Sequence, residues 1–225
     1  MNRRSLLTIL ALVSGALRVR AALTGDATQS YIFTPLSTIL IIAVAWTDTG
    51  DESDPYRRFV LAGLLFSLVG DVFLMMPDDR FLAGLGAFLL AHLCYIIAFT
   101  RDGGFTGSPV ITLPLALFGS WMMTMLLPGV GNLAIPVFAY MVVILTMAMQ
   151  ALERWRRGSH AGALSAGLGA ILFLVSDATL GIRRFAGGFA GDRAVLLVTY
   201  LLAQYLIAIS AGMRARGRLA RAATS

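Results

Sequence analysis

The sequence contains no lysine and carries little charge of either sign. Of its 225 residues, only 13% are charged, whereas 58% are hydrophobic. Soluble domains carry about 25% charged residues, so this composition excludes an ordinary soluble protein and predicts an integral membrane protein. The net charge of +6 comes entirely from arginines. These arginines flank apolar runs instead of forming a basic stripe, so nucleic acid is not an expected partner.

Cysteine and histidine are also scarce. The single cysteine, Cys94, lies inside an apolar run, so an intrachain disulfide is impossible. Of the two histidines, His92 lies in the same run and His160 lies in a polar connector. Metal centres need several such ligands close together, so we expect no metal site.

Long apolar runs divide the sequence, and each run ends at turn residues or charges. About 17–25 consecutive apolar residues are enough to cross a bilayer as a helix. We therefore expect an all-α membrane protein with one domain over 1–225, built as a bundle of eight transmembrane helices and followed by a basic cytoplasmic tail at 214–225. The expected helices are approximately 5–20, 31–47, 58–76, 81–100, 109–127, 132–152, 161–181 and 194–213.

The first apolar run has two interpretations. Arg3 and Arg4, followed by a short apolar stretch, have the layout of a secretory signal peptide. However, Arg18 and Arg20 stand where a neutral, small-residue cleavage site is needed, which favours a retained first membrane helix.

Eight helices place both termini on one side of the membrane. The termini and connections on that side hold twelve arginines, and the connections on the other side hold six. Because cytoplasmic connections are enriched in arginine, both termini are expected in the cytoplasm. Helical bundles with this arginine bias are typical of the bacterial inner membrane.

Two aspartates interrupt the apolar runs in matching contexts. Leu68-Val69-Gly70-Asp71 and Leu174-Val175-Ser176-Asp177 are each followed by a leucine three residues after the aspartate. A carboxylate inside the membrane costs several kcal/mol unless it is protonated, paired or hydrated, so it marks a candidate functional site. With a rise of 1.5 Å per residue, each aspartate is expected about 6–8 Å from the outer end of its helix. The alternative is a structural aspartate that is hydrogen-bonded to a neighbour.

The two motifs lie about half the chain length apart. This spacing is compatible with two parallel repeats of four helices, in which equivalent motifs keep the same orientation.

Other polar side chains lie in the later runs. His92 and Tyr95 are three residues apart and share a helix face, as do Tyr200 and Gln204, which are four apart. Tyr140 lies in the run at about 132–152. Each of these residues could form helix–helix hydrogen bonds or support a reaction at the aspartates.

In combination, these motifs resemble the YhhN-like lysoplasmalogenase family. The resemblance covers about residues 30–210. It rests on Pro35-Leu36-Ser37-Thr38, Leu68-Val69-Gly70-Asp71-Val72-Phe73-Leu74, Phe81, Gly84, Phe88, Ala91-His92 with Tyr95, Ala98 and Phe99, Ser176-Asp177 with Leu180, and Tyr200 with Gln204. One departure is Thr34, because the family often has lysine before the proline of the second helix.

The resemblance implies a multi-pass membrane hydrolase that needs no cofactor. Its expected substrate is a lysophospholipid, lysoplasmalogen. Water cleaves the vinyl ether bond of this lipid to give a fatty aldehyde and a glycerophospho-alcohol such as glycerophosphoethanolamine or glycerophosphocholine. Asp71 and Asp177 are the expected catalytic residues, supported by His92, Tyr95, Tyr140, Tyr200 and Gln204.

The chemistry suits a pair of carboxyl groups. Protonation of the vinyl ether forms an oxocarbenium ion, which needs an acid, a nearby negative charge and a positioned water. Two buried carboxyls that share one proton would provide these groups. In glycosidases, whose transition state is also oxocarbenium-like, two carboxyls likewise divide the acid and carboxylate roles. Which aspartate is the acid is open at this point. A small proton-coupled transporter is the alternative, because it would use intramembrane aspartates equally well.

Overall fold

A computed structural model describes residues 2–47, 54–101, 103–158 and 161–222. His160 lies outside the described residues. Within them the chain is all-α, as expected from the sequence. The helices are α1 (Arg3–Thr24), α2 (Ala27–Thr47), α3 (Pro55–Met75), α4 (Phe81–Thr100), α5 (Pro109–Val130), the short 3₁₀ helix η1 (Gly131–Leu133), α6 (Ala134–Arg156), α7 (Ala163–Phe185) and α8 (Asp192–Ala222).

The helix ends follow local sequence signals. The Asn2 side chain accepts a hydrogen bond from the backbone N–H of Arg4 at the start of α1, and Gly25 ends that helix with a φ of 73°. Asp54 caps α3 in the same way, and Pro55 takes the first helical position, where its missing N–H costs nothing. These capping residues mark the starts of α1 and α3, the two helices that carry Arg18 and Asp71.

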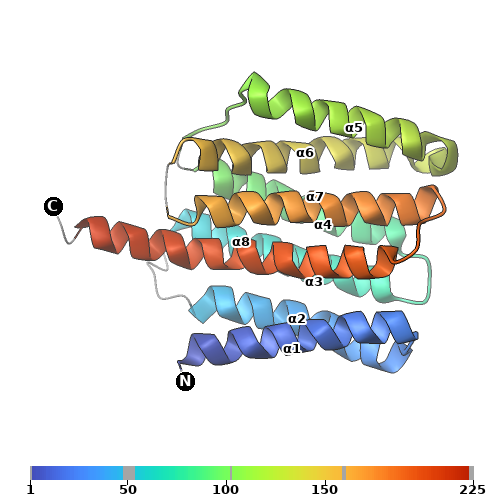
Figure 1. Ribbon diagram of the computed structural model, residues 1–225, viewed down its shortest axis with the longest axis horizontal. Coiled ribbons are helices and arrows are strands. Elements are labelled where there is room, and N and C mark those ends of the chain that lie inside the picture. The colour runs from blue at the N-terminus through green and yellow to red at the C-terminus, as the bar shows by residue number, and fades with distance from the viewer. Residues whose placement is uncertain (1, 48–53, 102, 159–160, 223–225) are drawn as a thin grey trace.

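Seven helical segments of the described chain are long and apolar enough to cross a membrane. Six of them are single helices. The seventh is the 48-residue stretch Pro109–Arg156, in which α5, η1 and α6 follow one another without a break. The expected number of eight spans is therefore not established by length and composition, although Figure 1 shows α5 folding back along α6.

The helices lie alongside one another in one bundle (Figure 1). The start of α1 and the end of α8 are at the same end of it, as the sequence predicts for the two termini. Helices α1 and α2, α3 and α4, and α7 and α8 pack in pairs, and α8 also contacts α1, α2 and α3. This places α8 next to both the first and the third helix, so side chains from distant parts of the sequence can meet.

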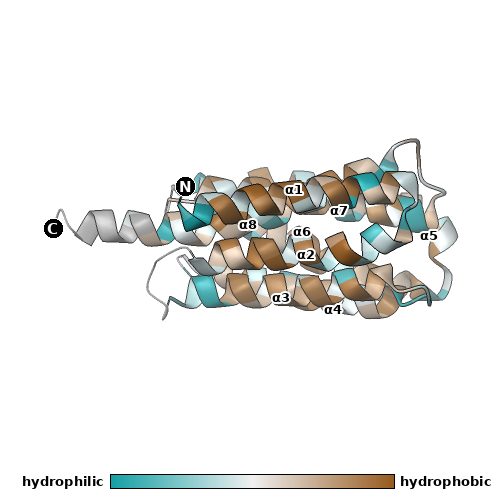
Figure 2. Cartoon of the chain, turned by 90° about the horizontal axis from the view of Figure 1, so that it is seen from below, coloured by the Kyte–Doolittle hydropathy of each residue, from teal (hydrophilic) through white to brown (hydrophobic). Residues whose placement is uncertain are grey.

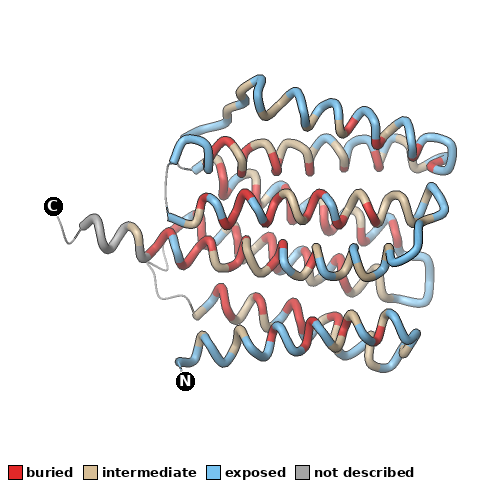
Figure 3. Tube along the Cα trace, viewed as in Figure 1, coloured by how far each residue is buried: buried red, intermediate tan, exposed pale blue. Residues whose placement is uncertain are grey.

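The outer surface is apolar along most of the bundle length. Figure 2 shows hydrophobic residues on the outward faces of several helices, and Figure 3 shows the buried residues on the faces turned toward the centre. Large side chains such as Leu12, Val110 and Ile135 are exposed. Exposed apolar side chains along most of the bundle are suited to contact with lipid.

Helices α3 and α4 approach closely at the first aspartate motif. A Cβ atom added to Gly70 would lie 2.6 Å from the ring of Phe88. The glycine before Asp71 is therefore needed for packing. Ser176, at the equivalent place before Asp177, instead donates a hydrogen bond to the carbonyl of Leu196 on α8, at 3.1 Å.

Several helix ends differ from the predicted ones. Helix α1 extends to Thr24, whereas the predicted helix ends at residue 20. Arg18 and Arg20 end the apolar run, but arginine does not interrupt a helix. Helix α7 extends to Phe185 instead of residue 181, so Asp177 lies eight residues before its end, whereas Asp71 lies four before the end of α3. Helix α8 continues to Ala222, into the segment expected as a tail, and its Arg214 is buried in an ion pair with Asp54.

Candidate functional site

Asp71 lies at the meeting point of four helices. Its side chain on α3 accepts hydrogen bonds from Nη2 of Arg18 on α1 at 2.9 Å and from Oγ1 of Thr38 on α2 at 2.6 Å. A third hydrogen bond comes from the hydroxyl of Tyr200 on α8, at 2.8 Å. The residue is only 4% exposed. Three donors, one of them a guanidinium group, are the surroundings that a charged carboxylate requires when it is removed from water.

A chain of hydrogen bonds continues from Asp71 into the bundle. The Tyr200 hydroxyl accepts a bond from Nε2 of Gln204 at 3.0 Å, and Oε1 of Gln204 accepts one from the Tyr95 hydroxyl at 2.9 Å. All three side chains are buried. Since each donor points toward the next acceptor, the chain orients the Tyr200 hydroxyl toward Asp71.

Asp177 has a different set of partners. Its Oδ2 atom accepts a hydrogen bond from the hydroxyl of Tyr140 on α6 and lies 3.4 Å from Nε2 of His92 on α4. The same His92 nitrogen is 2.9 Å from the Tyr140 hydroxyl. Nδ1 of His92 is buried without a hydrogen-bond partner among the described residues. The described structure places no arginine in an ion pair with Asp177, so its partners carry no fixed positive charge.

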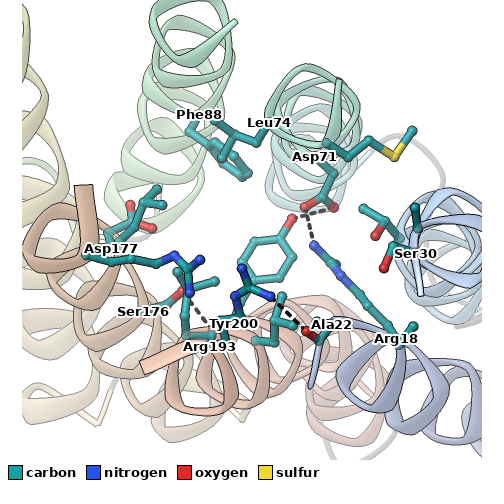
Figure 4. A pocket seen from close by; sticks show the side chains of 18 of the residues that line it. Arg18, Ala22, Ser30, Asp71, Leu74, Phe88, Ser176, Asp177, Arg193 and Tyr200 are labelled. Atoms are coloured by element: carbon teal, nitrogen blue, oxygen red, sulfur yellow. Dashed lines mark hydrogen bonds and ion pairs between the residues drawn. The ribbon is translucent and has the colours of Figure 1, made fainter. Parts of the chain in front are cut away.

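The two aspartates face one cavity of about 400 Å³. In Figure 4, Asp71 and Arg18 lie on one wall and Asp177 and Ser176 on the opposite wall, with Tyr200 and Arg193 between them in this view. No hydrogen bond in the described structure joins the two carboxyl groups. Each aspartate has its own hydrogen-bond donors, and the expected sharing of one proton between the two carboxyl groups stays a prediction.

The cavity has a polar and an apolar part. Its lining includes Arg18, Ala21, Ala22, Gly25, Ala27, Ser30, Thr34, Asp71, Leu74, Met75, Phe88, Ser176, Asp177, Leu180, Arg183, Arg193, Leu196, Leu197 and Tyr200. Leucines, Met75 and Phe88 can contact a hydrocarbon chain, whereas the arginines and hydroxyl groups can contact a polar group.

A second, smaller cavity of about 60 Å³ shares the lining residues Asp177 and Leu180 with the first. It is lined mainly by apolar side chains of α4, α5, α6 and α7, among them Leu85, Phe118 and Met122. Asp177 belongs to the lining of both cavities. Asp177 therefore borders both a mixed cavity and an apolar one.

The structure brings the seven residues selected from sequence into two hydrogen-bonded groups. Asp71, Tyr200, Gln204 and Tyr95 form one, and Asp177, Tyr140 and His92 form the other. Two partners of Asp71 are not predicted as site residues from the sequence: Arg18, whose charge is expected only to flank the first apolar run, and Thr38, which appears only within the motif Pro35-Leu36-Ser37-Thr38. The sequence signal that could have indicated Arg18 is its place among the arginines on the side of the membrane expected to carry fewer of them.

A comparison with family profiles places the chain in a family. A profile of the YhhN family matches residues 29–211, which include both aspartates and all five supporting residues. The chain belongs to the YhhN family. Residues of α1, including Arg18, lie outside the matched segment.

Curated relatives of this YhhN family member include proteins with an assigned activity. The human protein named lysoplasmalogenase TMEM86B is 34% identical over 161 residues, covering 71% of this chain and 66% of the relative. The Mycobacterium bovis protein named lysoplasmalogenase is 31% identical over 194 residues, covering 82% and 71%. The Escherichia coli O157:H7 protein named uncharacterized membrane protein YhhN is 29% identical over 195 residues, covering 87% and 93%. No solved structure matches the chain.

Proposed function

We propose that this protein is a lysoplasmalogenase, which hydrolyses the vinyl ether bond of a lysoplasmalogen to a fatty aldehyde and a glycerophospho-alcohol. Family membership and relatives that are named for this activity support the assignment. The observation that carries it is the pair of carboxyl groups with different partners on one cavity. Asp71 has a guanidinium partner, and Asp177 has only uncharged or titratable ones.

The difference in partners suggests a division of roles. Asp177 is the proton donor, because no fixed positive charge holds it in the ionised form. It transfers its proton to the vinyl carbon distant from the ether oxygen, and the positive charge then develops on the other vinyl carbon and the oxygen. Asp71, ion-paired to Arg18, remains a carboxylate and lowers the energy of this oxocarbenium ion.

Water completes the reaction. It adds to the oxocarbenium carbon and returns one proton to the Asp177 carboxylate, which restores the acid. The resulting hemiacetal then transfers its hydroxyl proton to the ether oxygen as the carbon–oxygen bond breaks. The products are the aldehyde and the free glycerol hydroxyl, so one water is consumed and the enzyme is unchanged.

The supporting residues have matching tasks. Tyr140 and His92 orient the Asp177 carboxyl group through their hydrogen bonds. Tyr95, Gln204 and Tyr200 form the chain that holds Asp71. The reaction requires no cofactor, because protonation by a carboxyl group and addition of water are sufficient.

The two cavities suggest how the lipid lies. The vinyl ether must reach Asp177, which lines both cavities. The hydrocarbon chain enters the apolar cavity beside α5 and α6, and the glycerophosphate part occupies the larger one. About 60 Å³ holds only a few methylene groups, so the rest of the chain extends along the apolar surface toward the bilayer.

Aldehyde release from a panel of lysolipids tests the proposal. The purified protein is incubated in detergent micelles with vinyl ether, alkyl ether and acyl lysolipids of equal chain length. We expect aldehyde from the vinyl ether substrate only. Micelles hold no ion gradient, so a proton-coupled transporter would release no aldehyde and this outcome would reject the hydrolase assignment.

For the topology we propose eight crossings, with α5 and α6 crossing separately, and both termini in the cytoplasm of a bacterial cell. The arginine distribution supports this orientation, and the return of α5 along α6 supports the count. The cavity then opens at the outer leaflet of the inner membrane. Cysteine labelling of single positions in the α1–α2 and α7–α8 connections, from outside intact spheroplasts, tests this orientation.

A further inference from the structure

Arg18 has more hydrogen-bonding capacity than its ion pair uses. Only Nη2 bonds to Asp71, whereas Nε and Nη1 are buried and have no partner among the described residues. The residue is 7% exposed and lines the large cavity, and its guanidinium carbon lies 5.1 Å from the centre of the Tyr200 ring. Figure 4 shows the side chain reaching into the cavity. Buried guanidinium donors without partners are costly, so these two groups point to a ligand.

A second arginine stands close to this position on the helix next to α1. Arg193, near the start of α8, donates from Nη1 to the carbonyl of Ala22 at 3.0 Å. Ala22 is one helical turn beyond Arg18, so the two guanidinium groups meet α1 at successive turns. Arg193 also lines the cavity and has no carboxylate partner in the described structure.

The charges around the cavity leave one cation uncompensated. Arg18 is paired with Asp71, and Arg183 is paired with Asp192 at 3.0 Å. If Asp177 carries its proton, Arg193 remains as a net positive charge in the lining. A phosphodiester carries one negative charge and offers acceptor oxygens that match guanidinium donors.

We infer that Arg18 and Arg193 form a binding subsite for the phosphate group of a lysophospholipid. This inference rests on the proposed function and assigns the residues by which that site would recognise the phosphate group of its substrate. Arg18 lies outside the segment that the family profile matches, so in this proposal the first helix supplies part of the binding site. Thr34, which lines the same cavity, adds a hydroxyl group to its polar part.

Binding of lipids that cannot be hydrolysed tests the subsite without relying on activity. The probes are a short-chain 1-O-alkyl-glycero-3-phosphocholine, the 1-O-alkylglycerol of equal chain length, and inorganic phosphate. Dissociation constants are measured by titration calorimetry in detergent. The wild-type protein should bind the phosphate-bearing lipid about tenfold or more tightly than the alkylglycerol. Inorganic phosphate should bind far more weakly than the phospholipid.

Arg193→Gln is the main variant, and Arg20→Gln is its control because Arg20 is exposed on α1 and does not line the cavity. Arg193→Gln should weaken binding of the phosphate-bearing lipid about tenfold and change the affinity for the alkylglycerol little. Arg20→Gln should leave both affinities unchanged. The double variant Arg18→Gln/Asp71→Asn, which removes the ion pair without leaving a single charge, should also lose the preference for the phosphate-bearing lipid.

The subsite is rejected if Arg193→Gln and the double variant keep the wild-type preference for the phosphate-bearing lipid. Inorganic phosphate binding as tightly as this lipid would reject the lipid headgroup as the ligand. Failure of the proposed function looks different, because the wild-type protein would then release no aldehyde while still preferring the phosphate-bearing lipid. Aldehyde release without any dependence of affinity on phosphate would reject the subsite alone.

Discussion

Asp71 and Asp177 share a sequence motif but not an environment. Asp71 accepts hydrogen bonds from α1, α2 and α8, one of them from a buried arginine. Asp177 interacts with a tyrosine and a histidine from α6 and α4 and lines two cavities. The same motif thus places a carboxyl group on each of two helices, and the side chains of the neighbouring helices determine which carboxyl group is paired with a cation.

The largest expected effect concerns catalysis at Asp177. Asp177→Asn removes the proposed proton donor while keeping the shape of the side chain. The rate of aldehyde release should fall about 10²- to 10⁴-fold, the usual contribution of a general acid. The melting temperature in detergent should change little, because an asparagine still accepts the Tyr140 hydrogen bond. Near-normal turnover in this variant would remove Asp177 from the mechanism.

The same substitution at Asp71 should act mainly on stability. Asp71→Asn leaves the Arg18 charge buried without a carboxylate, which typically costs 3–5 kcal/mol of unfolding free energy. The double variant Arg18→Gln/Asp71→Asn should recover much of this loss but remain inactive. Thermal or SDS unfolding of the wild type, Asp71→Asn, the double variant and Asp177→Asn measures these differences. An equal stability loss in Asp177→Asn and Asp71→Asn would contradict the contrast between the two sites.

The two tyrosines provide a finer comparison. Tyr140→Phe removes the hydroxyl that bonds to Asp177, and Tyr200→Phe removes one of three donors to Asp71. We expect about a 100-fold loss of kcat for Tyr140→Phe and about a tenfold loss for Tyr200→Phe. A larger effect at Tyr200 would exchange the acid and carboxylate roles of the two aspartates.

The smallest expected effect comes from the residues that precede the aspartates. Gly70→Ser places a side chain against the Phe88 ring and should cost about 1–3 kcal/mol. Ser176→Gly loses the hydrogen bond to Leu196 and gains backbone freedom in a helix, so about 1–2 kcal/mol is expected. Unfolding measurements on both variants check these two losses of unfolding free energy. If Gly70→Ser is harmless, the close packing of α3 on α4 does not explain the glycine.

The sequence predicts most of the fold and part of the site. Apolar runs locate the long apolar helices, and the cost of an intramembrane carboxylate selects Asp71 and Asp177 as candidate site residues without any structure. The role of Arg18 is not predictable in this way. An arginine near the end of an apolar run has the pattern of a topology signal, and its ion pair joins residues 53 positions apart in sequence.

Helix ends explain a second difference. With a predicted end at residue 20, Arg18 belongs to the membrane boundary, whereas the observed end at Thr24 places it inside the bundle. Arg18, Arg183 and Arg193 belong to the six arginines on the side that is expected to lie outside the cytoplasm. All three line the cavity. Arginines on the less favoured side are thus a signal that sequence analysis could have used for the site.

One measurement tests the central claim most directly. Lysoplasmalogen is hydrolysed in D₂O, the aldehyde is trapped at once, and its mass is compared with that of an unlabelled aldehyde kept in D₂O for the same time. Protonation of the vinyl carbon by a carboxyl group predicts one deuterium on the carbon next to the aldehyde carbon. Aldehyde without that deuterium, or no aldehyde at all, would contradict the proposed mechanism.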